Sequence, residues 1–213
     1  MAKKKSARSG EKTTYYFGST RTEGNGSMRE LLGGKGANLA EMTGIGLPVP
    51  PGFTITTDCC DQYYQQGRQL PDGLVEQVKK NIRTLERELN KKFGDHRNPL
   101  LVSVRSGAAA SMPGMMDTIL NLGLTDESTE GLASASDNAR FAYDAYRRLI
   151  NMFGGVVMGV EHEHFEEAFA KIKKKYRVQL DTDVPTEGLI ELCEAYKKVY
   201  RRHTKSGFPQ DPL

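Results

Sequence analysis

In the stretch Leu31-Leu-Gly-Gly-Lys-Gly-Ala-Asn-Leu39, three glycines surround one lysine just before a helical pattern. Glycines let backbone N–H groups come close to phosphate oxygens, and the first turn of a helix attracts negative charge. Lys35 adds a mobile positive charge, so the stretch is a candidate anion site. A glycine-rich turn with an exposed lysine and no ligand is an equally good interpretation of this motif taken alone.

Two familiar phosphate loops are excluded by spacing. A P-loop needs Ser or Thr after the lysine and a glycine five residues before the second glycine, but Gly36 and Arg29 occupy those positions. A dinucleotide-binding fingerprint needs a third glycine where Leu39 stands. The motif therefore stays a general anion-binding candidate.

The sequence around this stretch predicts an α/β region. Short runs rich in Thr and apolar residues predict strands over 13–18, 52–57 and 118–124, and helices are expected over 37–42 and 58–66. Apolar residues recur every three or four positions from 74 to 93, which is typical of a helix with one buried stripe. The run 100–104, LLVSV, predicts a strand that is buried on both faces.

After about residue 125 the pattern becomes mostly helical. The apolar stripes are Phe141, Ala145, Leu149 and Met152; Phe165, Phe169, Ile172 and Tyr176; and Leu189, Leu192, Tyr196 and Val199. The expected class is α/β (α+β). The expected division is a disordered basic tail over 1–12, an α/β part over 13–124, a helical lobe over 125–210, and a connection at 211–213 that continues into a longer protein.

Composition narrows the classes of function. The 213 residues carry 30 Lys and Arg against 27 Asp and Glu, a formal net charge of +3, and residues 1–22 alone carry six basic residues and one acidic residue. A solvated tail is a better interpretation of this basic segment than a nucleic-acid arm, so no nucleic-acid partner is expected. No apolar run approaches the roughly 20 residues of a membrane span. Three cysteines cannot form the disulfide framework of a small secreted domain, so we expect a cytoplasmic protein.

A second candidate site begins at the end of the predicted buried strand, in Val102-Ser-Val-Arg-Ser-Gly-Ala108. Arg105 would project from a sheet edge, where open α/β sheets bind ligands, and its planar donor fork suits phosphate. The Met-Pro-Gly-Met-Met run at 112–116 follows and is adaptable enough to contact a purine. A salt-bridged structural arginine and a methionine cluster in the core are the alternatives. Asp117 is the one carboxylate here and does not define a magnesium pair.

The histidines and cysteines carry weaker signals. His162 and His164 are two residues apart and point to different sides of a helix, whereas a zinc site favours a spacing of four. We interpret them as solvent-facing or capping residues, and His96 and His203 as isolated residues in polar surroundings. The adjacent cysteines at 59 and 60 and the single one at 193 are interpreted as packing residues.

Three stretches together resemble a known family. They are Gly33-Gly-Lys-Gly-Ala-Asn-Leu-Ala-Glu-Met42, Leu47-Pro-Val-Pro-Pro-Gly-Phe-Thr-Ile55, and the run from Val102 to Leu124. These motifs resemble the start of the pyruvate, phosphate dikinases, and the resemblance runs from about Tyr15 to the last residue. The related phosphoenolpyruvate synthases share the first motif and the arginine, but the Ser106-Gly107 sequence and the methionine run favour the dikinases.

The resemblance implies an ATP-grasp-like nucleotide-binding subdomain over 13–124 with an inserted helical lobe over 125–210. It implies that Lys35 and Arg105 contact ATP phosphates, with Gly34 and Gly36 beside them. The segment with Gly114, Met116, Asp117 and Thr118 would border the nucleotide. Family members transfer phosphoryl groups from ATP through a phosphohistidine to pyruvate, giving phosphoenolpyruvate, AMP and diphosphate, and need Mg²⁺ and a monovalent cation.

Much of that machinery is not expected in this chain. None of the four histidines stands in the Thr-Ser-His context of the family's phosphocarrier, and the resemblance places the magnesium ligands beyond residue 213. We therefore expect an N-terminal fragment with no catalytic or metal-binding residue of its own, inactive without the remainder of the dikinase chain, which would be a partner in a possible homo-oligomer. A phosphoenolpyruvate synthase-type enzyme and a stand-alone, non-catalytic nucleotide-binding module are the alternatives.

Overall fold

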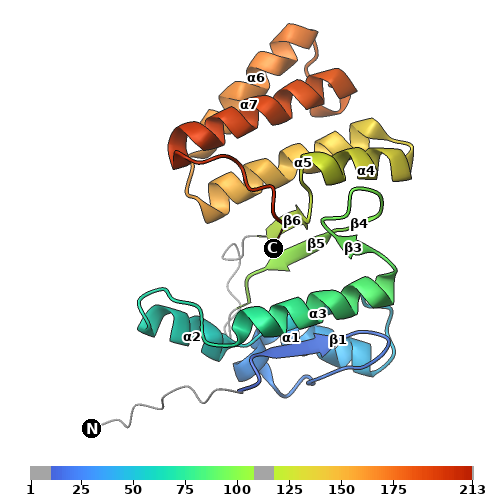
Figure 1. The fold of residues 1–213 in the computed structure, drawn as a ribbon, viewed down its shortest axis with the longest axis vertical. Helices are drawn as coiled ribbons and strands as arrows, with labels where there is room; N and C mark the ends of the chain where they lie inside the picture. Colours follow the sequence, from blue (N-terminus) through green and yellow to red (C-terminus); the bar gives the residue numbers. More distant parts are fainter. Residues whose placement is uncertain (1–10, 108–117, 213) are drawn as a thin grey trace. The chain divides into compact units, whose positions relative to one another are not determined.

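A computed structural model describes residues 11–107 and 118–212, and these residues form two compact units. The first unit contains residues 11–90 together with 106 and 107, and the second contains 91–105 and 118–212. Both units mix helices with small sheets (Figure 1), so the expected α/β class is confirmed at this level. The boundary near residue 90 differs in position from the change of sequence pattern near residue 125.

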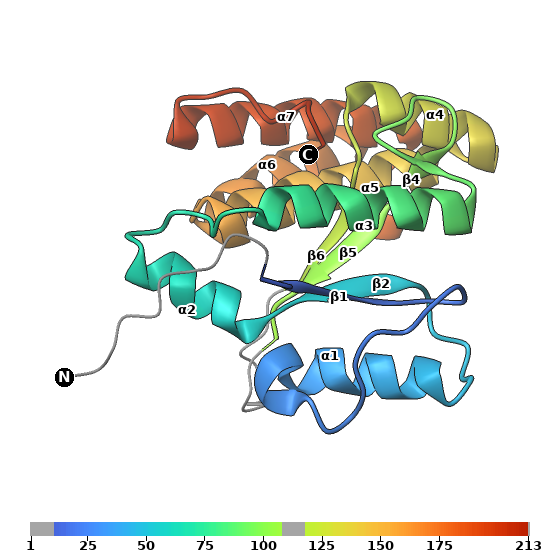
Figure 2. The same ribbon diagram turned by 60° about the horizontal axis from the view of Figure 1, so that its bottom comes forward.

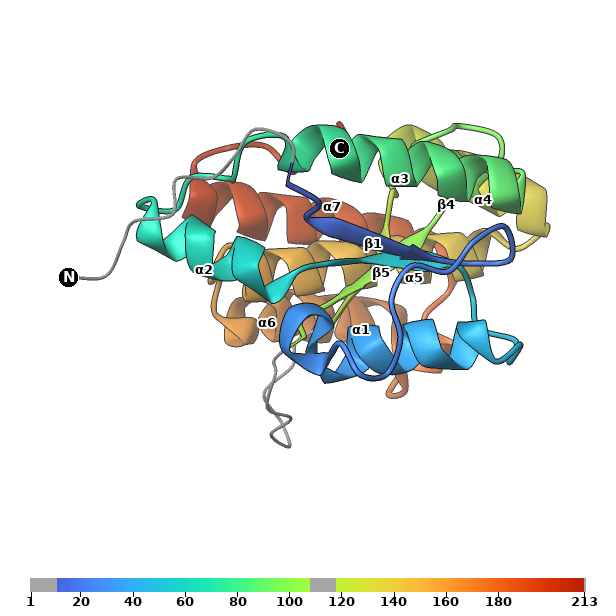
Figure 3. The ribbon, with the colours of Figure 1, turned by 90° about the horizontal axis from the view of Figure 1, so that it is seen from below.

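The first unit is built on two antiparallel strands. Strand β1 (Thr14–Phe17) pairs with β2 (Gly52–Ile55), with Tyr15 opposite Thr54, so both predicted strands are confirmed. Helix α1 (Arg29–Gly44) covers one face of this ladder and α3 (Leu74–Leu89) covers the other (Figures 2 and 3). The short helix α2 (Thr57–Gln65) follows β2 directly.

The apolar stripe of α3 ends earlier than its pattern predicts. Leu74, Ile82 and Leu85 are buried, but Leu89 is 40% exposed and the helix stops at this residue. Asn90 then takes a left-handed conformation, with φ 50°, which reverses the chain. Phe93 therefore belongs to a strand and not to the helix.

The second unit begins with two small ladders. Strand β3 (Lys92–Phe93) pairs in parallel with β4 (Pro99–Leu100). Strand β5 (Val102–Arg105) pairs antiparallel with β6 (Thr118–Leu122), and the register shifts between Val102 and Val104. The expected burial of β5 on both faces is wrong, because Val104 is 48% exposed and Ser103 and Arg105 are also exposed. A local apolar run does not reveal how many elements cover a strand.

Helices make up the rest of the second unit, as the stripes predict. They are α4 (Asp126–Ser136), α5 (Ala139–Met152), a π-helical turn at Phe153–Val157, α6 (His162–Tyr176), a 3₁₀ turn at Asp181–Asp183, and α7 (Thr186–Thr204). Thr125 begins α4 with a reciprocal capping box to Ser128, and the side chain of Asn138 caps α5. Phe141 departs from the expected stripe, since it is 49% exposed in the first turn of α5.

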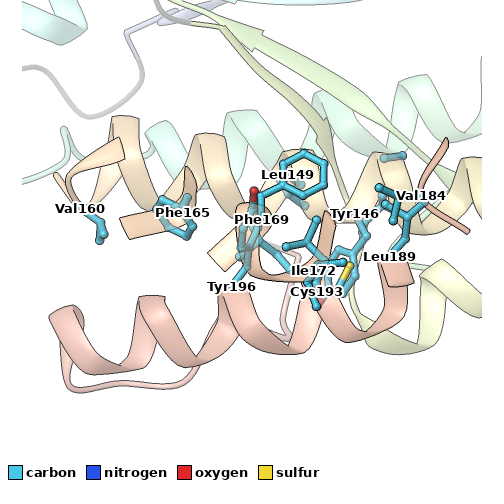
Figure 4. Close-up of a cluster of buried hydrophobic side chains, with 14 residues drawn as sticks. Tyr146, Leu149, Val160, Phe165, Phe169, Ile172, Val184, Leu189, Cys193 and Tyr196 are labelled. Atoms are coloured by element: carbon cyan, nitrogen blue, oxygen red, sulfur yellow. The ribbon is translucent and has the colours of Figure 1, made fainter. Parts of the chain in front are cut away.

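The core of this unit is formed by α5, α6 and α7. Leu149, Phe165, Phe169 and Tyr196 lie together there and are almost completely buried (Figure 4). Burial of side chains of this size contributes roughly 1.5–3 kcal/mol each before conformational entropy is counted. The apolar stripes identified in the sequence are therefore what holds the three helices together.

The segment after α7 folds back onto the same unit. The ring of Phe208 packs edge-on against Tyr146, Phe153 and Tyr200. The side-chain oxygen of Gln210 accepts a hydrogen bond of 2.9 Å from the backbone N–H of Asp126. These contacts hold the extended, proline-containing segment against the second unit. The sequence pattern alone predicts only that this segment is a connection.

Candidate functional site

The glycine turn lies within α1, which is interrupted at Gly33. This residue has φ 67° and ψ 167°, so it is not helical, and α1 consists of a short segment before it and a longer one after it. A left-handed φ of this kind is accessible to glycine at little cost. The helical segment that follows begins at Gly34, so the glycines and Lys35 open a helix as the sequence predicts.

The two glycines on either side of Lys35 have different surroundings. A Cβ atom placed on Gly36 would lie 2.7 Å from both the Cγ2 and the Oγ1 atom of Thr54 in β2. A Cβ atom on Gly34 would meet no described atom within 4 Å. Gly36 is therefore required for packing against the strand, whereas packing gives no reason for a glycine at 34.

The side chain of Lys35 forms no ion pair with any residue in the two described stretches, 11–107 and 118–212. Lys35 is half-buried. A half-buried lysine typically packs its aliphatic stem and keeps its ammonium group in solvent. Its positive charge is therefore available to an external anion.

Arg105 is the last residue of β5 and stands opposite Thr118 in β6. It is exposed, and among the described residues it too has no ion-pair partner. The expected open α/β sheet behind it is not found among the described residues, where β5 and β6 form a two-stranded antiparallel ladder. The alternative of a salt-bridged structural arginine finds no support in the described part of the chain.

The other predicted nucleotide-binding residues are only partly described. Gly114, Met116 and Asp117 lie outside the described residues, while Thr118 is half-buried at the start of β6. The candidate site is also divided between the units, with Gly34, Lys35 and Gly36 in the first and Arg105 and Thr118 in the second. The structure thus describes two halves of the candidate site, each in its own unit.

Two side chains that support turns of the first unit carry no sequence signal. The hydroxyl of Thr57, at the start of α2, donates to the backbone carbonyl of Glu30 at 2.5 Å and lies 3.3 Å from that of Leu31. Both carbonyls belong to the last residues of α1 before its break. Threonine is too common near helix starts for its spacing alone to have identified this contact.

The second supporting side chain is Glu88 of α3. Its carboxylate accepts hydrogen bonds from the Tyr16 hydroxyl at 2.8 Å and from the backbone N–H of Ser19 at 2.7 Å. Burial, together with this hydrogen bond to Glu88, raises the pKa of Tyr16 above its ordinary value. Burial opposes ionisation of Glu88, but the hydrogen bonds from Ser19 and Tyr16 outweigh it and lower the pKa of the carboxyl. Glu88 thereby fixes the turn after β1.

A metal centre is not found where side chains are described. No group of three His, Cys, Asp or Glu side chains in 11–107 and 118–212 is arranged to hold a metal ion. His162 lies 3.3 Å from Glu166 and His164 lies 3.7 Å from Glu161, both along α6. His203 is not isolated as expected, since its ring centroid is 4.3 Å from that of His164. These residues do not fit a magnesium site.

The described helices also include none that is long and apolar enough to span a membrane. Cys59 and Cys193 are buried and Cys60 is exposed, and all three thiols are free. Burial raises the pKa of Cys193 to about 12, so this thiol stays protonated and behaves as a packing residue.

Comparison with known proteins identifies the relatives of the chain. The family model for the pyruvate phosphate dikinase AMP/ATP-binding domain matches residues 29–74 and 69–205. A chloroplastic pyruvate, phosphate dikinase of Flaveria pringlei is 53% identical over 202 residues, which are 95% of this chain and 21% of that protein. The pyruvate, phosphate dikinase of Clostridium symbiosum is 54% identical over 191 residues, 89% of this chain and 22% of the relative. That of Giardia intestinalis is 52% identical over 201 residues, 93% and 23% respectively. The chain thus spans about a fifth of the length of the curated relatives it matches.

Proposed function

This chain belongs to the family of the pyruvate phosphate dikinase AMP/ATP-binding domain, and on that basis we propose that it binds ATP through the phosphate groups. Lys35 and Arg105 supply the two cationic contacts. The backbone around Gly34 and Gly36 approaches the phosphate oxygens, and the segment from Gly114 through Met116 and Asp117 to Thr118 borders the nucleotide.

The observation that carries this proposal is the state of Lys35. A half-buried lysine at the start of a helix, beside an interruption that only a glycine adopts easily, has no anionic partner among the described residues. A cation without an internal partner keeps its charge for a ligand, and an anionic ligand would offset the cost of desolvating it. A phosphate group would supply the missing charge, and the helix start would add to the attraction.

We propose that the complete protein carries out the reaction of the dikinases that it resembles. The phosphoryl group would pass from ATP through a phosphohistidine to pyruvate, giving phosphoenolpyruvate, AMP and diphosphate. Transfer of this kind depends on positioning and on neutralisation of phosphate charge by cationic side chains and metal. The resemblance to the dikinases puts the magnesium ligands beyond residue 213, so we assign Mg²⁺ and the monovalent cation to other parts of the enzyme and expect this chain alone to be inactive.

The finer points of architecture belong to the same proposal. We assign 13–124 to an ATP-grasp-like subdomain, 125–210 to a helical lobe inserted in it, 1–12 to a basic tail, and 211–213 to a connection to the remaining domains. We also propose a cytoplasmic location. The remainder of the dikinase would be its principal partner, in a possible homo-oligomer.

The test is a double-mutant cycle on ATP binding with Lys35→Ala, Arg105→Ala and the double variant, measured by calorimetry. Hydrogen bonds to charged groups contribute about 1.5–3 kcal/mol, so each single variant should weaken binding roughly 10-fold or more. Shared contact with one triphosphate predicts a non-additive double variant. Arg148→Ala is the matched control, because Arg148 is a surface cation of the helical lobe.

Three outcomes would contradict the proposal. Unchanged affinity in either single variant would remove that residue from the site. Strict additivity would separate the two cations into independent sites. Tight binding of ATP by the 213-residue chain, which we expect to bind weakly because its cleft is incomplete, would show that the cleft lies elsewhere.

A further inference from the structure

The break in α1 interrupts a specific set of backbone hydrogen bonds. In a continuous α-helix the N–H groups of Gly34 and Lys35 would donate to the carbonyls of Glu30 and Leu31, four residues earlier. Both of those bonds would span Gly33, whose φ of 67° and ψ of 167° do not continue the helix. Two carbonyls on one side of the break and two N–H groups on the other thus need other partners.

Thr57 supplies a hydrogen-bond donor to the two carbonyls before the break. Its hydroxyl lies 2.5 Å from the carbonyl oxygen of Glu30 and 3.3 Å from that of Leu31, so the two acceptors share one donor. These are the same two carbonyls that a continuous helix would have paired with Gly34 and Lys35. Thr57 is held in place because it is the first residue of α2, directly after β2.

We propose that Thr57 is a positioning residue for ATP: by occupying the carbonyls of Glu30 and Leu31, it keeps α1 broken and leaves the N–H groups of Gly34 and Lys35 to the phosphate. The inference rests on the proposed function of the glycine turn. It assigns to α2 a role that its sequence does not suggest, since Thr57 itself need not touch the nucleotide.

A second contact holds the same turn from the other side. Gly36 packs so closely on Thr54 that a methyl group there would overlap the threonine side chain. Thr54 and Thr57 lie on either side of the end of β2, so the strand and the helix after it hold the turn together. The turn can therefore keep one conformation before the ligand arrives, which reduces the entropic cost of binding.

The experiment compares Thr57→Val, which keeps the shape but removes the hydroxyl, with Thr57→Ser, which keeps the hydroxyl. The matched control is Thr43→Val, because the Thr43 hydroxyl also donates to a carbonyl of α1, that of Leu39 at 2.7 Å, but away from the break. Without ATP, hydrogen exchange of the Gly34 and Lys35 amides should slow at least several-fold in Thr57→Val, because the helix closes across Gly33. Thr57→Ser and Thr43→Val should exchange like the unmodified chain.

ATP is then titrated into each variant of the chain, with amide shifts as the readout. One hydrogen bond of ordinary net value predicts that Thr57→Val weakens ATP binding roughly 3- to 10-fold, with Thr57→Ser near the unmodified affinity. Unchanged exchange at both amides in Thr57→Val, or an equal loss of affinity in Thr43→Val, would overturn the role of Thr57. If ATP moves neither amide in the unmodified chain, the proposed phosphate site fails instead, while the exchange data still decide whether Thr57 holds the break.

Discussion

Cationic side chains have carboxylate partners in the helical part of the second unit but not, among the described residues, in the glycine turn of the first. The buried Arg147 pairs with Asp144 at 2.8 Å, and the mostly buried side chain of Lys197 lies 2.8 Å from Asp126 and 2.6 Å from Glu194. Lys35 has no such partner in the described stretches, and neither has Arg105. Within the described residues, these cations thus fall into a group with carboxylate partners and a group without them.

The difference separates stability from binding. A buried cation with an internal partner contributes to holding the helices in place, and its removal leaves the partner charge uncompensated. An unpaired cation contributes little to folding, and its full charge remains for a ligand. Substitution of a paired, buried cation should therefore lower the free energy of unfolding. Substitution of Lys35 or Arg105 should instead lower the affinity for ATP.

The largest effect should come from Arg147→Ala. This side chain is 9% exposed, lies over the ring of Phe169 at 4.8 Å from its centroid, and is paired with Asp144. The change removes a mostly buried side chain from its contact with Phe169 and takes away one of the two cations paired with Asp144. The free energy of unfolding in urea should therefore fall by about 2–3 kcal/mol.

Arg148→Ala is the control for this change, because Arg148 pairs with the same Asp144 but its side chain is 54% exposed. An exposed pair contributes about 0–1 kcal/mol. Lys35→Ala should also leave the unfolding free energy nearly unchanged. If Lys35→Ala lowered the free energy of unfolding by several kcal/mol, Lys35 would contribute to stability like the paired cations, and the two groups would not differ.

The next largest effect on stability should come from Glu88→Gln. It tests whether a charged side chain also stabilises the fold of the first unit. Hydrogen bonds to a carboxylate contribute more than neutral ones, so we expect a loss of about 1–2 kcal/mol at neutral pH. In the folded protein, the hydrogen bonds from Ser19 and Tyr16 hold the pKa of Glu88 below its ordinary value. Its contribution is therefore present above that value and is lost as the pH falls through the lower, folded-state pKa.

Urea unfolding of Glu88→Gln and the unmodified chain across pH 3–7 checks this sign. The difference between the two should be largest near neutral pH and should shrink in acid. Glu86→Gln, two residues earlier on the same helix, shows the effect of removing a carboxylate from α3 at another position. A difference that grows in acid would mean that Glu88 is not stabilised as an anion.

Local sequence patterns predicted most helices and strands correctly, but they did not predict which of these elements contact one another. The strands β1 and β2 and the helical stripes follow from alternation and spacing that each segment carries by itself. The contact between Thr57 and Glu30 joins residues 27 apart, and that between Tyr16 and Glu88 joins residues 72 apart. Such contacts depend on how elements pack, which spacing within one element does not encode. The exposure of Val104 has the same cause, because burial of β5 depends on its neighbours.

The candidate site shows the same limit. The helical pattern over 37–42 correctly predicted a helix beside the glycines, although the helical segment already begins at Gly34. The pattern did not show that α1 begins earlier, at Arg29, and is interrupted at Gly33. Nor did the motif separate Gly36, which the strand requires, from Gly34, which it does not.

The smallest effects on stability are expected from the two glycines, which test within a single turn whether a residue serves the fold or the ligand. Gly36→Ala places a methyl group 2.7 Å from atoms of Thr54. Overpacking costs about 1–3 kcal/mol, and the gain in helix propensity of about 1 kcal/mol offsets part of it. The net loss should be about 1 kcal/mol in urea unfolding.

Gly34→Ala should instead leave the chain as stable or slightly more stable, because its new methyl group meets no described atom within 4 Å. ATP affinity should nevertheless fall, by roughly 10-fold or more, since the methyl group occupies space that a phosphate needs for close approach to the backbone. A variant that gains stability while losing its ligand would show that this glycine serves the ligand and not the fold. Undiminished binding of ATP by Gly34→Ala would mean that the phosphates do not approach this part of the turn, and that Lys35 reaches them from a distance.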